Sequence, residues 1–195
     1  MERVHRLLAD EEYRQSIKKL EKLEQDRIFC HHGIEHLLAV ARIAWIENLE
    51  EKLGLEKEEI YLAALLHDLG RVDEYERGIP HHEAGKKRAE YFLRKLGAPK
   101  TQQKEILRAI GEHRTRNRTE DGARASVNRA ADGARTSMNR TADGDRTSVN
   151  RTADPGGKLA ALLAEADKSS RNCSYCQAYE ACKWSEDEKN RPLRY

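Results

Sequence analysis

The chain has 195 residues, enough for one domain with an appendage. Its 36 basic and 34 acidic residues nearly cancel, which argues against a protein that binds polyanions in general. It contains no apolar stretch long enough to span a bilayer, and its N-terminus lacks the apolar core of a secretory signal, so we expect a cytoplasmic protein with no membrane partner.

Apolar residues recur at helical spacing in several segments, which define the predicted helices. In chain order these are 10–25, 34–53, 56–68, 81–97, 99–113 and 157–167. Asp10 is a suitable N-cap for the first helix, and Gly54 ends the second. The polar residues 71–80 are expected to form a connection. No segment alternates apolar and polar residues at period two, so the predicted fold is all-α.

From Asn117 the sequence repeats with a period of eleven residues, each unit offering one large apolar side chain. One such side chain cannot offset the entropy lost on ordering the unit. We therefore expect 115–156 to be a disordered or loosely folded insertion between the last two core helices of a single domain, 1–195. Between 116 and 151 there are 8 arginines, 5 acidic residues and no aromatic residue, which favours a charged spacer over a nucleic-acid-binding arm.

Side chains suited to metal binding stand at the ends, or on the apolar faces, of five predicted helices. They are His36, His67 with Asp68, His81 with His82, His113 and Asp167. Neutral imidazole and carboxylate are common ligands of divalent cations, and converging helices can hold such ligands rigidly. One buried histidine on an apolar face is usually a packing residue, but five positions on separate helices are hard to explain in that way.

Three of these positions lie in motifs that resemble the HD-domain superfamily of metal-dependent phosphohydrolases. The motifs are His36-x-x-x-Val40-Ala41-Arg42, Leu66-His67-Asp68-Leu69-Gly70-Arg71 and Ala166-Asp167-Lys168. The resemblance covers about 30–170 apart from the repeat. The remaining histidines are similar to those of the two-metal branch, which includes bacterial HD-type diadenosine tetraphosphate hydrolases and HD-GYP cyclic dinucleotide phosphodiesterases. The chain lacks the Gly-Tyr-Pro signature of the latter group.

The resemblance implies an all-α HD-domain helical bundle with two metal sites that share one carboxylate. The first ion would be held by His36, His67, Asp68 and Asp167. Asp68 would bridge to a second ion held by His113 and by His81 or His82, and the spacing of His81 to Gly85 favours His81. Fe or Mn suits these ligands best, with Mg, Co, Ni and Zn as open alternatives.

The reaction implied is hydrolysis of a phosphoester or phosphoanhydride bond in a nucleotide by a metal-activated water, with Asp68 and Arg71 as catalytic residues. Arg71, Lys168 and Arg171 could bind phosphate oxygens, or could be ordinary surface cations. His32 lies four residues before His36 and is expected to contact substrate or to support the site, whereas His31 is expected to be exposed. The alternative function is a catalytically silent metal-binding HD module that acts in regulation or partner binding.

The four cysteines leave two interpretations open. Three of them, Cys173, Cys176 and Cys182, belong to a C-terminal tail, 171–195, and Cys30 precedes the first ligand helix. Together they could form a four-thiolate Zn or Fe–S site. A single Cys-x-x-Cys with irregularly spaced partners is weak evidence, however, and plain reduced thiols are favoured. The identity of the substrate and the oligomeric state are not specified by the sequence.

Overall fold

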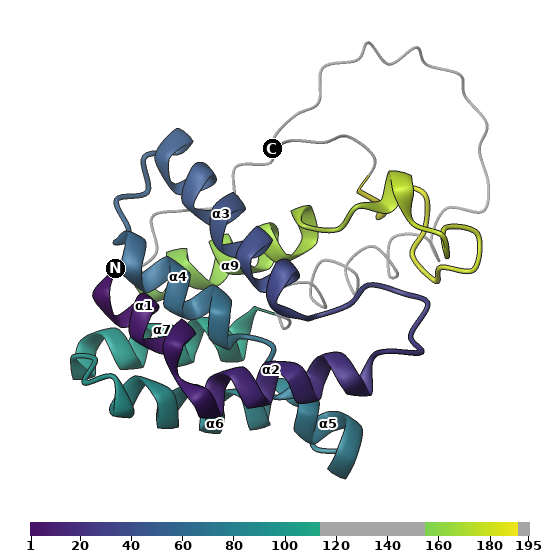
Figure 1. The fold of residues 1–195 in the computed structure, drawn as a ribbon. Coiled ribbons are helices and arrows are strands. Elements are labelled where there is room, and N and C mark those ends of the chain that lie inside the picture. The colour runs from purple at the N-terminus through teal and green to yellow at the C-terminus, as the bar shows by residue number, and fades with distance from the viewer. Residues whose placement is uncertain (114–154, 191–195) are drawn as a thin grey trace, which may run out of the picture.

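The computed structural model describes residues 1–113 and 155–190, and all regular structure in these two ranges is helical (Figure 1). The helices are α1 (Glu2–Ala9), α2 (Glu11–Leu23), α3 (Ile34–Glu50), α4 (Lys57–Leu66), α5 (Arg71–Arg77), α6 (His81–Lys95), α7 (Lys100–Glu112), α9 (Pro155–Ser169) and the 3-10 turn η1 (Cys173–Tyr175). The predicted all-α fold is confirmed. Among the described helices, none combines the length and apolar character needed to cross a membrane.

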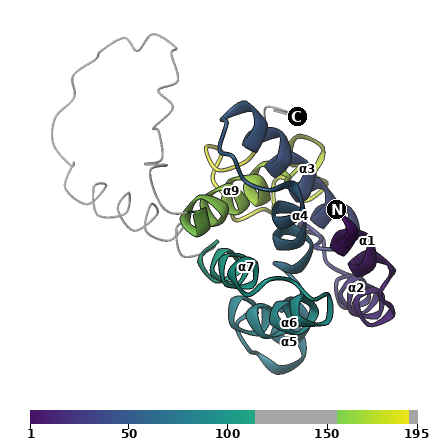
Figure 2. The same cartoon turned by 90° about the vertical axis from the view of Figure 1, so that its left-hand side faces the viewer.

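Helix α4 lies at the centre of the bundle, where it contacts α1, α3, α6, α7 and α9 (Figure 2). Its residues Ile60 and Leu62–Leu66 are all buried. A helix that is apolar on every side is stable only inside a core, because each face needs a partner that excludes water. The end of α4, and the dipeptide that follows it, are therefore surrounded by other helices.

The predicted start of the first helix agrees with the structure, whereas the predicted end of the second helix lies too late. The Asp10 carboxylate accepts a hydrogen bond from the Tyr13 backbone N–H at 3.1 Å and so caps α2. Helix α3 ends at Glu50, three residues before the predicted end, and Gly54, with a φ of 75° that favours glycine, lies beyond the turn that follows. Helix α9 begins at Pro155, two residues earlier than predicted.

Two short helices were not predicted. Helix α1 buries Val4 and Leu7, and the segment 71–77, expected to be a connection, forms α5. Tertiary contacts stabilise α5 as a helix, since it packs on α2 and α6. The buried Asp73 carboxylate pairs with Arg88 of α6, and Gly78 ends the helix with a φ of 67°. The prediction for 71–77 was wrong because charged residues in so short a helix show no apolar periodicity.

The repeat insertion predicted for 115–156 lies outside the described residues, apart from the start of α9. The described part of the tail, 171–190, contains one turn of 3-10 helix and otherwise bends and turns. It lies at the end of the bundle where α9 ends and α3 begins (Figure 1). Trp184 is half-buried, with the Arg171 guanidinium 4.5 Å from its ring centroid.

Candidate metal centre

Helices α3, α4 and α9 bring four of the predicted ligands together. His36 Nε2 lies 3.6 Å from Asp68 Oδ2 and 3.4 Å from Asp167 Oδ1. His67 Nε2 lies 3.2 Å from the same Asp68 oxygen. One ligand atom from each of the four residues lies within 4.8 Å of the others, close enough for one ion to be held between them.

Asp68 also belongs to a second group, which is completed by His81 of α6 and His113 at the end of α7. The ligand atoms of this group lie within 4.8 Å of one another, and all three residues are buried. The ring centroids of His81 and His113 are 6.0 Å apart. His82 is half-buried and belongs to neither group, because the next residue on a helix is rotated by about 100°.

The backbone orients two imidazoles in the same way. His67 Nδ1 donates to the Ala64 carbonyl at 2.7 Å, and His113 Nδ1 donates to the Ile110 carbonyl at 2.6 Å. Each histidine follows the last residue of its helix, where carbonyls three residues earlier lack a helical partner. The bond fixes the proton on Nδ1 and leaves the Nε2 lone pair to face the centre.

Side chains orient the other two imidazoles. Ser170 Oγ donates to the Asp167 carbonyl at 2.8 Å and lies 3.2 Å from His36 Nδ1, whose proton it can accept. Both carboxylate oxygens of Glu74 lie 3.0 Å from His81 Nδ1. A carboxylate behind an imidazole increases its basicity as a ligand, and partners of this kind are typical of metal-binding histidines.

We expect Glu74→Gln to weaken metal binding at the second group by about 10–100-fold, because the neutral amide orients the His81 ring less firmly and does not increase its basicity. Metal titration followed by calorimetry measures the change. Glu76→Gln is the matched control, since its carboxylate pairs with Lys19 on the surface at 2.8 Å. Equal metal affinity in the two variants would show that Glu74 has no such role.

Several polar atoms at the centre are buried without a hydrogen bond to the described residues. They include Nε2 of His36, Nε2 of His67 and Oδ2 of Asp68, whereas Oδ1 of Asp68 forms an ion pair with Arg71 Nε at 2.8 Å. Burying an imidazole nitrogen and a carboxylate in this way is costly, and a divalent cation satisfies both. The residues present therefore fit a metal.

The charges at the centre shift the pKa values of its members in opposite directions. Burial lowers the pKa of His67, but the Asp68 and Asp167 carboxylates outweigh it and raise that pKa to about 10. Burial raises the pKa of Asp68, but His67 and Arg71 hold it well below its usual range. Burial, together with the charge on His67, lowers the pKa of His113 to about 4, so that imidazole is neutral at pH 7 and ready to bind a cation.

We expect metal to stabilise the protein more strongly as the pH rises from 6.5 towards 10. In the metal-free protein the proton on His67 stabilises the fold fully below pH 6.5, and this contribution is lost as the pH rises through about 10. A metal ion must displace that proton, so its binding strengthens by up to about 1.4 kcal/mol per pH unit. Thermal unfolding with and without Mn²⁺ across this range checks the prediction. A difference in Tm that stays constant or shrinks would contradict it.

The predicted phosphate-binding cations differ in where they lie. Arg71 is buried, with its Nε 2.8 Å from Asp68 Oδ1, so the alternative of an ordinary surface cation is wrong for this residue. Lys168 is exposed and does not line the cavity that opens beside His36. Arg171 does line it, and its Nη1 is buried without a hydrogen bond to the described residues.

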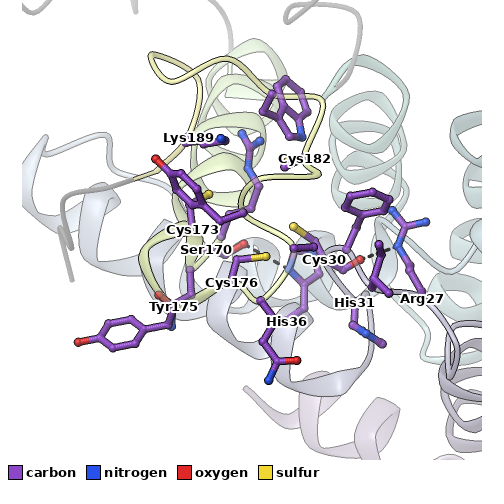
Figure 3. A pocket seen from close by; sticks show the side chains of 18 of the residues that line it. Arg27, Cys30, His31, His36, Ser170, Cys173, Tyr175, Cys176, Cys182 and Lys189 are labelled. Carbon is purple, nitrogen blue, oxygen red and sulfur yellow. Dashed lines mark hydrogen bonds between the residues drawn. The ribbon is translucent and has the colours of Figure 1, made fainter.

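A cavity of about 1240 Å³ reaches the metal centre at His36 (Figure 3). The loop before α3 and the tail after α9 form most of its wall. His31 is exposed, as expected, and lines this cavity. His32 is buried beside it, with its ring centroid 5.4 Å from that of His36. Its Nδ1 lies 2.6 Å from the Glu24 carboxylate, which also accepts a hydrogen bond from the His32 backbone N–H.

Three residues of the site were missed by sequence reasoning: Glu24, Glu74 and Ser170. The two glutamates pair with histidines eight and seven residues further along the chain, across a loop in each case. In a chain with 34 acidic residues, nothing distinguishes these two by composition or spacing. Ser170 follows Asp167 by three residues, and only the approach of α9 to α3 shows its bond to His36.

Comparison with known proteins agrees with this geometry. Residues 33–172 match the HD domain family, and this range contains both ligand groups. A protein of Clostridium beijerinckii described as uncharacterized is 32% identical over 195 residues, the full length of both chains. The crystal structure of a predicted HD superfamily hydrolase from an uncultured Thermotogales bacterium has the same fold, with a TM-score of 0.52 and 20% identity over 90% of this chain and 80% of that one. The chain belongs to the HD domain family.

Proposed function

We propose that this protein is a metal-dependent phosphohydrolase that cleaves a phosphoester or phosphoanhydride bond of a nucleotide-type substrate. The observation that carries the proposal is the buried Asp68 carboxylate, shared by two groups of oriented ligands. Divalent ions held by these groups would supply an activated water and neutralise charge on the phosphoryl oxygens. The imidazole and carboxylate donors favour Fe or Mn.

The protein's own charges support a phosphate at this position. Arg71 is fixed beside the centre by the Asp68 carboxylate, and its Nη1 lies 3.8 Å from the Glu74 carboxylate. The N–H groups not directed at these two carboxylates would bind non-bridging phosphate oxygens. A guanidinium keeps its proton, so in this role it positions and neutralises phosphate and does not act as an acid. Arg171 offers a second cation from the cavity wall. His32, held by Glu24, is proposed to contact the substrate beside His36.

The cavity supports a substrate larger than a lone phosphate group. Its volume of about 1240 Å³ exceeds the roughly 300–1,000 Å³ typical of small-molecule sites. Aromatic side chains of the tail, including Tyr175 and Tyr179, line it and could contact a base. A dinucleoside polyphosphate, as used by the hydrolases that the sequence resembles, is among the substrates of this class.

The test begins with elemental analysis of the purified protein and continues with a nucleotide panel assayed with the metal found. The panel contains nucleoside mono-, di- and triphosphates, dinucleoside polyphosphates and cyclic dinucleotides. Turnover that is lost on chelation and restored by that metal would support the proposal. A metal-loaded protein that hydrolyses none of them would overturn it and favour the catalytically silent metal-binding module.

A further inference from the structure

All four cysteines of the chain lie around the cavity beside the metal centre (Figure 3). Cys30 comes from the loop before α3, and Cys173, Cys176 and Cys182 come from the tail after α9. Each is half-buried, and none forms a disulfide. The fold thus places Cys30 at the same cavity as the three cysteines of the tail.

Cys30 is close enough to Cys173 and Cys176 for their charges to influence it. Burial raises the pKa of Cys30, and Cys173 and Cys176 raise it further, while the Arg171 guanidinium opposes them. Arg171 Nη1 is buried without a hydrogen bond to the described residues. A cation in this place would compensate the negative charge of a group of thiolates.

Apolar burial contributes little to holding the described tail in place. Between 171 and 190, Ala178 is the one apolar residue that is buried. The links to the body of the protein include a hydrogen bond from Asn190 Nδ2 to the Ser169 carbonyl of α9 at 2.7 Å. Segments without an apolar core of their own are commonly fixed by a metal or a disulfide.

We propose that Cys30, Cys173, Cys176 and Cys182 form a thiolate metal centre, separate from the His/Asp groups, that binds zinc or an iron–sulfur cluster and fastens the tail to the loop before α3. Thiolates select these metals over the harder cations that suit carboxylates. The proposal does not rest on hydrolysis, because a fastened tail is equally compatible with a silent module.

The spacing of the thiols favours the cluster over a single zinc ion. The four sulfurs are not drawn together as closely as the ligand atoms of the His/Asp groups, which lie within 4.8 Å of one another. Four thiolates on one zinc ion stand about 3.8 Å apart, given the Zn–S bond length and tetrahedral geometry. An iron–sulfur cluster separates its thiolates by the width of the cluster, so it does not require them to approach as closely as one zinc ion does.

The position of this centre indicates a structural role. Cys173 lies three residues after Ser170, which is bonded to His36, and six residues after Asp167. Fastening the tail would therefore limit the movement of the chain just beyond Asp167 and Ser170, while α9 itself holds Asp167. It would also fix the cavity wall formed by the tail.

The experiment measures iron, zinc and acid-labile sulfide per chain in protein purified without oxygen. Asp68→Asn, which removes a ligand shared by both His/Asp groups, should retain either about four iron and four sulfide ions or about one zinc ion per chain. Cys173→Ser/Cys176→Ser should lose this component and keep the metal of the His/Asp groups. Gln177→Ala, a neighbour in the same cavity wall that offers no thiol, is the matched control.

A second measurement does not depend on whether the cysteine variant folds. Titrating the native, unsubstituted protein with a mercurial reagent should release this metal in step with the blocking of its thiols. Iron with sulfide would identify a cluster, and zinc without sulfide would identify a single ion. Rapid reaction of all four thiols with no metal released would overturn the proposal, as would a cysteine variant with unchanged metal content.

Discussion

Replacing Asp68 by asparagine is expected to abolish hydrolysis and to remove metal from both His/Asp groups while the helical fold persists. Asp68 contributes to both groups, so no other single ligand change affects both ions directly. The amide is nearly isosteric but uncharged, and it removes the anionic partner nearest to His67 and to Arg71. Activity should fall by on the order of 10³ or more, as it does when a residue central to catalysis is removed. Elemental analysis and the nucleotide assay measure the two effects separately.

Asp73→Asn provides the control for this experiment. Asp73 is also a buried carboxylate near the site, but it pairs with Arg77 and Arg88 and belongs to neither ligand group. Its substitution should lower stability and leave the metal content unchanged. Turnover retained by Asp68→Asn with metal bound would refute the shared-ligand mechanism.

Replacing Gly70 by alanine is expected to destabilise the protein by about 3 kcal/mol or more and to weaken the second ligand group. A Cβ at Gly70 would collide with the His81 carbonyl oxygen and the Gly85 backbone N, and it would lie 2.9 Å from the Gly85 Cα. Backbone atoms cannot rotate away as a side chain can, so α6 must move. Because α6 carries His81, the separation of His81 from Asp68 must change with it.

Gly111→Ala is the matched control, because it adds the same methyl group without a collision with backbone atoms. A Cβ at Gly111 would meet only the end of the flexible Lys86 side chain, and alanine is the better helix former within α7. Urea unfolding compares the two variants, and metal titration reports the second ligand group. If Gly70→Ala unfolds at the same urea concentration as Gly111→Ala, the close approach of α6 to the end of α4 is not required.

The sequence was most informative where a local rule applies. Asp10 marked the start of α2 because capping depends on a few neighbouring residues, whereas Gly54 lies four residues beyond the end of α3. The segment 71–77 was not recognised as a helix, because contacts with α2 and α6 stabilise it and these elements are remote in the chain.

The sequence by itself determined the helical fold and the placement of ligand types at helix ends, since both follow from apolar periodicity along the chain. Only the tertiary structure decided which groups meet. It separated His81 from His82, paired His81 with Glu74, and gathered the cysteines around one cavity. The physical reason is that these contacts depend on how closely helices approach, and at Gly70 that distance is set by the absence of a side chain.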